Sequence, residues 1–212
     1  MQEASTKKIY DVQSLIYDYT FGQLVKKRIG RAIEHMKIQP GETVLDVGIG
    51  TGGSLQFYPK QAKVLGVDLS SGMLREARKK IVESSEYDNA TVFQGNALEL
   101  PFEDSSFDHI FISHVISVVS QPEMLVREAQ RVAKEGARIV ILNHFLSTNR
   151  FVAMLEKWAN PICQKIGWRS DLALADLVAK TQIEIDYRYK LRSVDLWETV
   201  VTTNTKSALA LA

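Results

Sequence analysis

A cluster of glycines directly after an apolar run is the feature of this sequence that most restricts its fold. The run Thr43–Val47 is rich in β-branched and aliphatic residues, which is typical of a buried parallel strand. Gly48, Gly50 and Gly52 follow it at alternate positions. Residues without a Cβ allow the unusual backbone angles of a tight turn, and they let a ligand lie directly against the backbone. The sequence therefore predicts a nucleotide-type binding loop after the first strand.

These glycines fit two spacings. Gly48, Gly50 and Gly53 match the dinucleotide-binding spacing Gly-x-Gly-x-x-Gly, in which a helix N-terminus receives a pyrophosphate. Asp46 argues against this interpretation, because a carboxylate two residues before the first glycine would repel a pyrophosphate. The same carboxylate suits a ligand that carries an amino group and a sulfonium centre. We therefore favour the second spacing, Asp-x-Gly-x-Gly-x-Gly.

This second spacing resembles motif I of the class I S-adenosylmethionine-dependent methyltransferases. A second apolar run ends in Asp68, at roughly the 20-residue distance from Asp46 that is expected of a carboxylate binding the two ribose hydroxyls. Residues 69–74 resemble the segment that follows motif I, with Ser70 as the expected N-cap of a helix and Met73 over the adenine. The resemblance implies S-adenosylmethionine as the cofactor.

A later segment completes the expected cofactor site. Residues 95–102 resemble motif II of the same family, in which a polar side chain, commonly Asp, reaches the adenine amino group. Asn96 stands at that position here, and its side-chain oxygen can accept a hydrogen bond from an amine. The complete set of expected cofactor residues is Asp46, Gly48, Gly50, Gly52, Asp68, Leu69, Met73, Asn96, Ala97 and Ser113.

Strand and helix patterns alternate along the middle of the chain, which predicts a doubly wound parallel α/β sheet. Beyond the first strand, we expect strands at 63–67, 92–93, 107–112 and 137–142, and helices at 53–58, 70–82 and 122–132. The runs 183–189 and 196–203 alternate like two antiparallel edge strands. The resemblance implies a seven-stranded, mostly parallel Rossmann-like sheet that ends in this antiparallel hairpin. Helices at 150–180, with Pro161 breaking or kinking the first, fill the place between strands five and six where the family carries substrate-recognising insertions.

Composition favours one globular domain. The 212 residues are 45% hydrophobic, and we expect a single domain, 1–212, with a helical cap at 1–40 and an insertion at 146–180. The single cysteine, Cys163, and the absence of a charged-then-apolar leader favour the cytoplasm. A net charge of +1 does not indicate a nucleic-acid partner, and the four histidines show no metal-ligand spacing, so no metal site is expected.

The first 40 residues carry two amphipathic helical patterns, at 12–19 and 21–36, and an excess of positive charge. Lys26, Lys27 and Arg31 lie away from the apolar stripe of the second pattern. Two interpretations stay open. The helix caps the domain and exposes a solvated charged face, or it lies on an anionic membrane surface, where each basic residue contributes ~1 kcal/mol. The longest apolar run is far below the ~20 residues of a membrane span.

Four local patterns narrow the resemblance to the soluble bacterial phospholipid N-methyltransferases. They lie at 17–22, 114–119, 143–145 and 167–170. These enzymes convert phosphatidylethanolamine towards phosphatidylcholine. The resemblance covers the chain from about Tyr10 to its end. It implies a phospholipid substrate and an enzyme that sits on the inner face of the membrane without spanning it, which agrees with the basic amphipathic helix. The sequence does not specify an oligomeric state.

Methyl transfer to an amine is an in-line displacement on an activated methyl group, so positioning carries much of the catalysis. The site must also accept a proton and tolerate cations. The ring faces of Tyr17 and Tyr19 suit that task, because aromatic faces attract ammonium by ~0.5 to 2 kcal/mol. Tyr19 fits the hydrophobic core equally well, since it falls on the apolar stripe. His144, at the end of the fifth strand, is expected to contact the phosphate or to relay a proton.

The other expected substrate residues are His114, Asn143, Trp168 and Arg169. The guanidinium of Arg169 matches phosphate oxygens, although a solvated surface position explains it equally well. A histidine such as His114 at a strand end also serves commonly as hydrogen-bonded structure. Three alternatives stay open: a methyltransferase of a soluble or quinone-like small molecule, a nicotinamide-dependent oxidoreductase, and a nucleotide-binding protein without chemistry. Asp46 argues against the oxidoreductase, and the filled insertion argues mildly against the binding protein.

Overall fold

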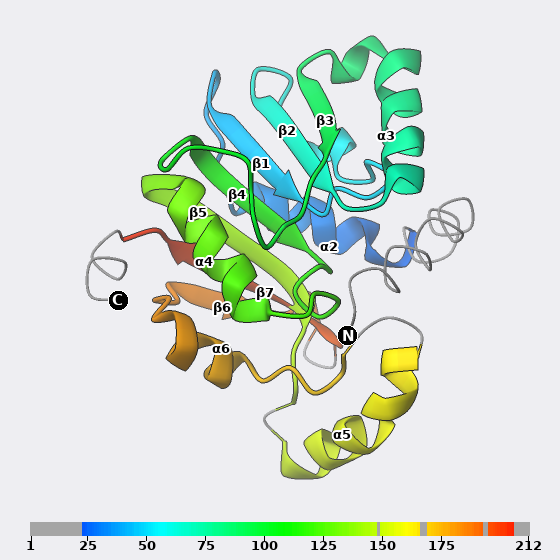
Figure 1. The fold of residues 1–212 in the computed structure, drawn as a ribbon, viewed down its shortest axis with the longest axis vertical. Helices are drawn as coiled ribbons and strands as arrows, with labels where there is room; N and C mark the ends of the chain where they lie inside the picture. The colour runs from blue at the N-terminus through cyan, green and yellow to red at the C-terminus, as the bar shows by residue number, and fades with distance from the viewer. Residues whose placement is uncertain (1–22, 148, 166–168, 193–194, 206–212) are drawn as a thin grey trace.

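The computed structural model describes residues 23–147, 149–165, 169–192 and 195–205, and within these ranges seven strands form one sheet (Figure 1). The strands are β1 (Thr43–Val47), β2 (Lys63–Asp68), β3 (Ala90–Gln94), β4 (Phe107–Ser113), β5 (Ala133–His144), β6 (Tyr187–Tyr189) and β7 (Trp197–Thr203). Their order across the sheet is β3-β2-β1-β4-β5-β7-β6. The first five strands pair in parallel, whereas β7 is antiparallel to both β5 and β6. This confirms the predicted doubly wound sheet and its antiparallel C-terminal hairpin.

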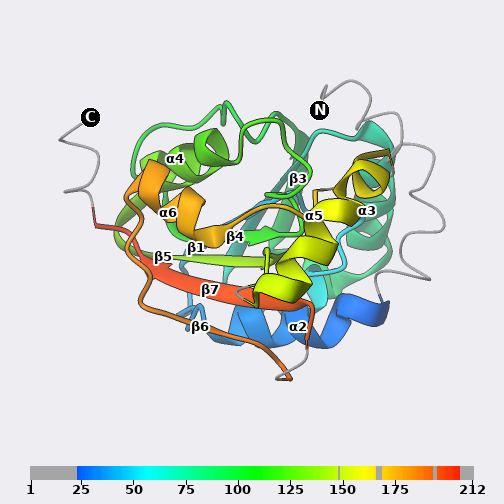
Figure 2. The same cartoon turned by 90° about the horizontal axis from the view of Figure 1, so that it is seen from below.

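Helices cover both faces of the sheet. They are α2 (Gln23–Glu34), α3 (Ser71–Glu83), α4 (Pro122–Val132), α5 (Arg150–Lys165) and α6 (Leu174–Thr181), with short 3-10 turns at Leu55–Phe57 and Ser85–Tyr87. Apolar side chains of α2 and α3 pack into the core on one face, and those of α4 and α6 into the core on the other. Figure 2 shows α2 on one side of the sheet and α4 with α6 on the opposite side.

The strands supply both cores by strict alternation. In β4, Ile110 and Ile112 pack on the α4 side, while Phe111 between them packs on the α2 side. Successive side chains of a strand point to opposite faces, so a sheet that is covered on both faces needs a nearly continuous apolar run. This is the reason that the parallel strands were readable from the sequence as short apolar runs.

The second N-terminal helical pattern is confirmed as α2, and its apolar stripe belongs to the core. Ala32, Ile33 and Met36 are almost fully buried against the sheet, whereas Lys26 and Lys27 are exposed. The apolar face of α2 is therefore occupied by the protein itself. The first pattern, at 12–19, lies outside the described residues.

Several boundaries differ from the predicted ones. Strand β5 begins at Ala133, because α4 runs directly into it, and a register irregularity against β4 adds residues that the apolar run does not show. Strand β6 keeps only its last three residues, since Ile183 packs into the core instead of pairing. Helix α5 continues past Pro161 to its end at Lys165. Within the described ranges, no helix is long and apolar enough to cross a bilayer.

Candidate active site

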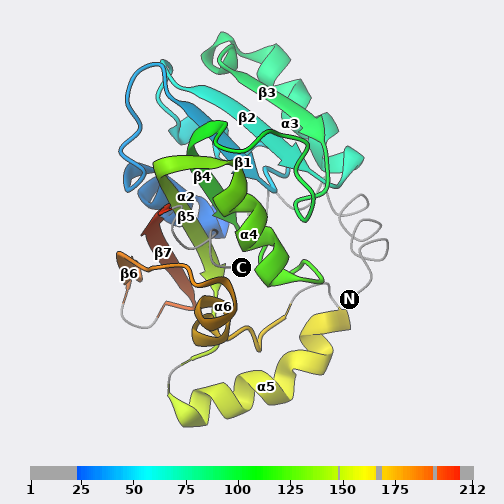
Figure 3. The ribbon, with the colours of Figure 1, turned by 60° about the vertical axis from the view of Figure 1, so that its left-hand side comes forward.

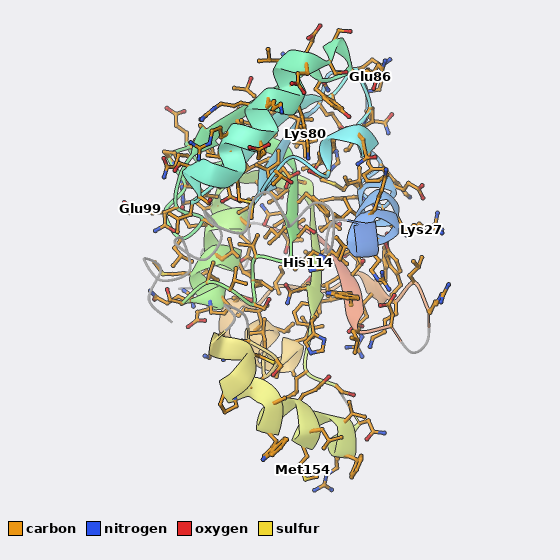
Figure 4. All side chains as sticks on the ribbon, turned by 90° about the vertical axis from the view of Figure 1, so that its right-hand side faces the viewer. Lys27, Lys80, Glu86, Glu99, His114 and Met154 are labelled. Carbon is orange, nitrogen blue, oxygen red and sulfur yellow. The ribbon has the colours of Figure 1, made fainter. Side chains whose placement is uncertain are left out.

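A cavity of about 260 Å³ opens at the carboxyl ends of β1, β2 and β4. This is the edge of a parallel sheet at which ligands collect. Figure 4 shows His114 near the centre of the molecule, with Lys80 of α3 above it and Lys27 of α2 to its right. Of the expected cofactor residues, all but Gly52 line the cavity: Asp46, Gly48, Gly50, Asp68, Leu69, Met73, Asn96, Ala97 and Ser113.

The glycine loop distinguishes the two spacings. Gly48, Gly50 and Gly52 all have positive φ, at 74°, 57° and 79°, a region that favours glycine. A Cβ on Gly48 would lie 1.9 Å from Cγ2 of Val115. Gly53 has no positive φ, and a Cβ there would meet nothing within 4 Å. The backbone therefore requires glycine at the positions of Asp-x-Gly-x-Gly-x-Gly and not at the last position of the dinucleotide spacing.

Asp46 is buried directly beneath this loop. Its Oδ2 accepts hydrogen bonds from the Ser54 hydroxyl at 2.5 Å and from the Tyr58 hydroxyl at 2.8 Å. Burial and, to a smaller extent, the negative charge of Asp68 raise the pKa of Asp46 to about 6, although the two hydrogen bonds oppose the rise. The ionised carboxylate of Asp46 therefore destabilises the folded free protein. A cationic ligand in the cavity would reduce this loss of folding free energy.

Asp68 connects the glycine loop to the start of α3. Its Oδ2 accepts from the Gly50 backbone N–H at 2.9 Å, and its Oδ1 accepts from the Ser70 N–H at 2.8 Å. The Ser70 hydroxyl in turn accepts from the Met73 N–H at 3.1 Å, which confirms Ser70 as the N-cap of α3. One carboxylate therefore sets the geometry of both segments that line this side of the cavity.

Asp68→Ala is expected to weaken S-adenosylmethionine binding about tenfold or more, because hydrogen bonds to a charged group contribute ~1.5 to 3 kcal/mol. The variant loses the acceptor expected for the ribose and also the two bonds that shape the loop. Calorimetry with S-adenosylmethionine measures the affinity, and Asp68→Asn, which keeps one acceptor oxygen, is the matched control. An unchanged dissociation constant in folded Asp68→Ala would contradict the placement of the ribose.

The far side of the cavity carries Asn96 and Ser113. Asn96 Oδ1 accepts from the Leu98 N–H at 2.9 Å, so its amide is held in a fixed orientation. The buried Ser113 hydroxyl has no hydrogen-bond partner among the described residues. A buried hydroxyl without a partner is uncommon in folded proteins, and one that lines a cavity is available to a ligand. Bare backbone at the glycine loop, a shaping carboxylate and this hydroxyl together fit an adenosine-containing cofactor.

His114 forms part of the cavity wall. It has a left-handed backbone, with φ of 59°, a strained conformation that is common at functional sites. Burial and, to a smaller extent, the positive charge of Arg28 lower the pKa of its imidazole to about 3, so the ring is neutral at physiological pH. Its ring meets Trp197 edge-on, with centroids 6.0 Å apart. A neutral wall does not repel a cationic amine.

A long-range ion pair supports this wall from behind. Arg28 of α2 donates from Nε and Nη2 to both carboxylate oxygens of Asp195 at 2.9 to 3.1 Å, and its guanidinium lies 4.7 Å over the Trp197 ring. Asp195 is almost completely buried. The pair fixes α2 against the start of β7, and Val25, Lys26 and Ile29 of α2 reach the cavity.

The structure describes four of the expected catalytic and substrate residues, and only one of these four lines the cavity. His114 lines the cavity, but Asn143, His144 and Arg169 do not. Asn143 is fully buried and accepts from the Ser117 hydroxyl at 3.3 Å. His144 Nδ1 donates to the Leu196 carbonyl at 2.8 Å, and its Nε2 lies 3.5 Å from Glu156 of α5.

The Arg169 guanidinium donates to Asp171 at 3.0 Å, although its backbone N–H binds the Ser117 carbonyl beside the cavity wall. Tyr17, Tyr19 and Trp168 lie outside the described residues, so their roles stay predictions. Sequence reasoning named only His114 of the segment 114–119 as a site residue, although Val118 and Val119 also line the cavity, and it named no residue of α2. Val118 and Val119 lie shortly after β4, so they could have been predicted from the sequence, whereas the α2 residues carry no local signal.

Among the described residues, no group of three or more His, Cys, Asp or Glu side chains could hold a metal ion.

Comparison with known proteins agrees with this geometry. Residues 45–141 match the family model described as a methyltransferase domain. A solved geranyl diphosphate methyltransferase in complex with S-adenosylmethionine shares the fold with a TM-score of 0.73 at 16% identity, covering 92% of this chain and 90% of that one. Together with a methyltransferase relative that is more than one-third identical over most of the chain, these matches show that the chain belongs to the S-adenosylmethionine-dependent methyltransferases, and S-adenosylmethionine is its cofactor.

Two curated relatives indicate different acceptors. A phosphatidylethanolamine N-methyltransferase of Cereibacter sphaeroides is 36% identical over 170 residues, which cover 80% of this chain and 83% of the relative. A ubiquinone/menaquinone biosynthesis C-methyltransferase of Hahella chejuensis is 29% identical over 161 residues, covering 72% and 64%. Both similarities extend well beyond the glycine loop, so the acceptor has to be argued separately.

Proposed function

We propose that this protein methylates the amino group of phosphatidylethanolamine and of its mono- and dimethyl forms, towards phosphatidylcholine. The observation that carries the proposal is the 36% identity to the phosphatidylethanolamine N-methyltransferase across 83% of that relative. The similarity to the quinone C-methyltransferase is lower and covers less of both chains. The four local patterns in the sequence agree with the same assignment.

The cavity wall supports an amine acceptor. The bound cofactor supplies a methyl group that is already activated by a sulfonium centre, so the protein has to position the nitrogen and remove its proton. The neutral imidazole of His114 and the apolar side chains of Val115, Val118 and Val119 form an uncharged part of the cavity wall, while Lys26 and Lys80 line other parts of it. Such a wall admits a cationic headgroup. In this proposal Tyr17 still serves the headgroup, whereas His144, which does not line the cavity, positions helix α5 through Glu156.

The second candidate is methylation of a quinone-like small molecule, favoured by the similarity to the Hahella chejuensis enzyme. Incubation with labelled S-adenosylmethionine and either phosphatidylethanolamine vesicles or a demethylmenaquinone distinguishes the two, after extraction and separation of the products. We expect label in mono-, di- and trimethylated phospholipid. Label in the quinone alone would replace the proposal by the second candidate.

A phospholipid substrate requires the enzyme to reach a bilayer, and we therefore propose a peripheral position on the inner face of the membrane. The exposed Lys26 and Lys27 of α2 add attraction to anionic lipid, which salt screens. The apolar side chains Val25, Ala32 and Ile33 of α2 are buried, however, so the described side chains of this helix offer the bilayer its charged face. Apolar contact with lipid has to come from another part of the chain.

A further inference from the structure

Helix α5 is oriented opposite to an ordinary surface helix. Surface helices of globular proteins turn their apolar stripe to the core and their polar face to water. Here the large apolar side chains of α5 are exposed to solvent. They are Phe151 (66% exposed), Val152 (40%), Met154 (57%), Leu155 (48%) and Trp158 (80%).

The polar side of α5 is the side that binds the protein. Glu156 Oε2 accepts from the Ser147 N–H at 2.8 Å, and Glu156 Oε1 lies 3.5 Å from His144 Nε2. Asn160, which is 8% exposed, accepts from the Ser170 N–H at 3.1 Å. The Ser170 hydroxyl donates to the Glu156 backbone carbonyl at 2.7 Å. These bonds fix the rotation of the helix so that its apolar stripe faces outwards.

The position of α5 relates this stripe to the active site. Figures 1 and 3 show the helix standing away from the sheet, beyond the end of β5. That end lies on the same edge of the sheet as the cavity, since β4 and β5 are parallel. Leu196, which is 60% exposed, lies near the same end of β5, because its carbonyl accepts a hydrogen bond from His144.

The charge that the structure describes beside the stripe is positive, as an anionic surface requires. The sequence of α5 contains one acid, Glu156, and this side chain faces inwards. The exposed face carries Arg150 and, in the described residues of the helix, no carboxylate. Exposed aromatic and long aliphatic side chains, a basic residue at the helix start and no outward acid are typical of a helix that lies in the plane of a lipid interface.

We propose that α5 lies in the boundary between headgroups and acyl chains of an anionic bilayer, with Phe151, Met154, Leu155 and Trp158 in contact with lipid. The choice of a bilayer as the occupant rests on the proposed function as a phospholipid methyltransferase. Contact through α5 would turn the edge of the sheet that carries the cavity towards the bilayer. The headgroup then has a short path to the cavity.

The test measures binding of the full-length protein to vesicles of phosphatidylglycerol and phosphatidylcholine that contain no phosphatidylethanolamine. Leu155→Glu with Trp158→Glu is expected to lower the bound fraction so that the partition coefficient falls about tenfold or more. Val82→Glu is the matched control, because Val82 is 86% exposed on α3 and lies on a different element. We expect this control to bind like the unchanged protein. Thermal unfolding establishes that each variant is folded, and Trp158→Ala, with a smaller expected loss, serves if the double variant does not fold.

Equal binding of the α5 variants and the unchanged protein, or no binding of the unchanged protein to anionic vesicles, would overturn the proposal. So would a dimer in sedimentation velocity that the α5 variant converts to monomers, since a second copy would then cover the stripe. The proposed function is tested apart from this with water-soluble dihexanoyl phosphatidylethanolamine. The α5 variant is expected to methylate it at the normal rate. Failure of the unchanged protein to methylate any phosphatidylethanolamine would overturn the function and leave the vesicle result standing.

Discussion

Gly48→Ala is expected to abolish S-adenosylmethionine binding and to destabilise the fold. The added Cβ would lie 1.9 Å from Cγ2 of Val115, at a residue whose φ of 74° already disfavours any L side chain by ~1 to 2 kcal/mol. The loop between β1 and the 3-10 turn must shift to relieve the overlap, and the shift displaces the backbone on which the cofactor lies. Calorimetry measures the affinity, and thermal unfolding measures the stability.

Gly53→Ala is the matched control, because its Cβ would enter open space at an ordinary φ. We expect this variant to bind the cofactor within a few-fold of the unchanged protein. Adding Val115→Ala to Gly48→Ala removes the methyl group nearest the new Cβ, so stability should return in part. Normal affinity in Gly48→Ala alone would show that the loop is not the binding surface.

Asp46→Asn is expected to make the free protein more stable at neutral pH while weakening cofactor binding. The folded pKa of Asp46, about 6, is above the value of about 3.9 for an exposed carboxyl. A raised pKa of an acid means that the folded state holds the proton more tightly, so stability is lost as the pH rises between these two values. At pH 7.5 the ionised carboxylate disfavours folding by about 3 kcal/mol, and at pH 5 by about half of that.

The amide substitution suits this comparison, because the Ser54 and Tyr58 hydroxyls both donate to one oxygen, which asparagine retains. Urea unfolding at pH 5 and pH 7.5 should therefore show a larger gain for Asp46→Asn at the higher pH. Calorimetry on the same variant should show lower affinity for S-adenosylmethionine, since the charge that opposes folding is the charge that attracts the cation. A gain that does not depend on pH would mean that the carboxylate is not the source of the difference.

Features that depend on neighbours in sequence were predicted well. The bounds of α4 agree with the predicted helix at 122–132, because Pro122 starts it and its apolar stripe is regular. The cofactor side of the cavity follows from β1 and β2, where each functional residue stands within a few positions of a strand end. Local chain geometry is sufficient to bring Asp46, Gly48 and Asp68 together.

Features that depend on distant contacts were not predictable. The side chain of His144 turns away from the cavity, because the Leu196 carbonyl and the Glu156 carboxylate hold its two ring nitrogens. The sequence pattern at 143–145 does not indicate either of these partners. A helical stripe such as that of α5 can be read from spacing, but spacing does not say whether the stripe faces the protein. The direction in which the stripe of α5 faces is set by Asn160 and Glu156, whose hydrogen-bond partners lie outside the helix.

The ion pair between Arg28 and Asp195 joins residues 167 positions apart, and this separation has a consequence for biosynthesis. A ribosome releases α2 early, and domains begin to fold from the N-terminus during synthesis. Yet the contacts that hold Arg28 of α2 can form only after Asp195 and Trp197 have emerged. Strand β7 lies between β5 and β6 in the sheet and pairs with both. It is also among the last parts of the chain to be made. The wall of the cavity that α2 provides is thus completed at the end of translation, so a chain that stops before β7 carries the whole glycine loop and still lacks a closed site.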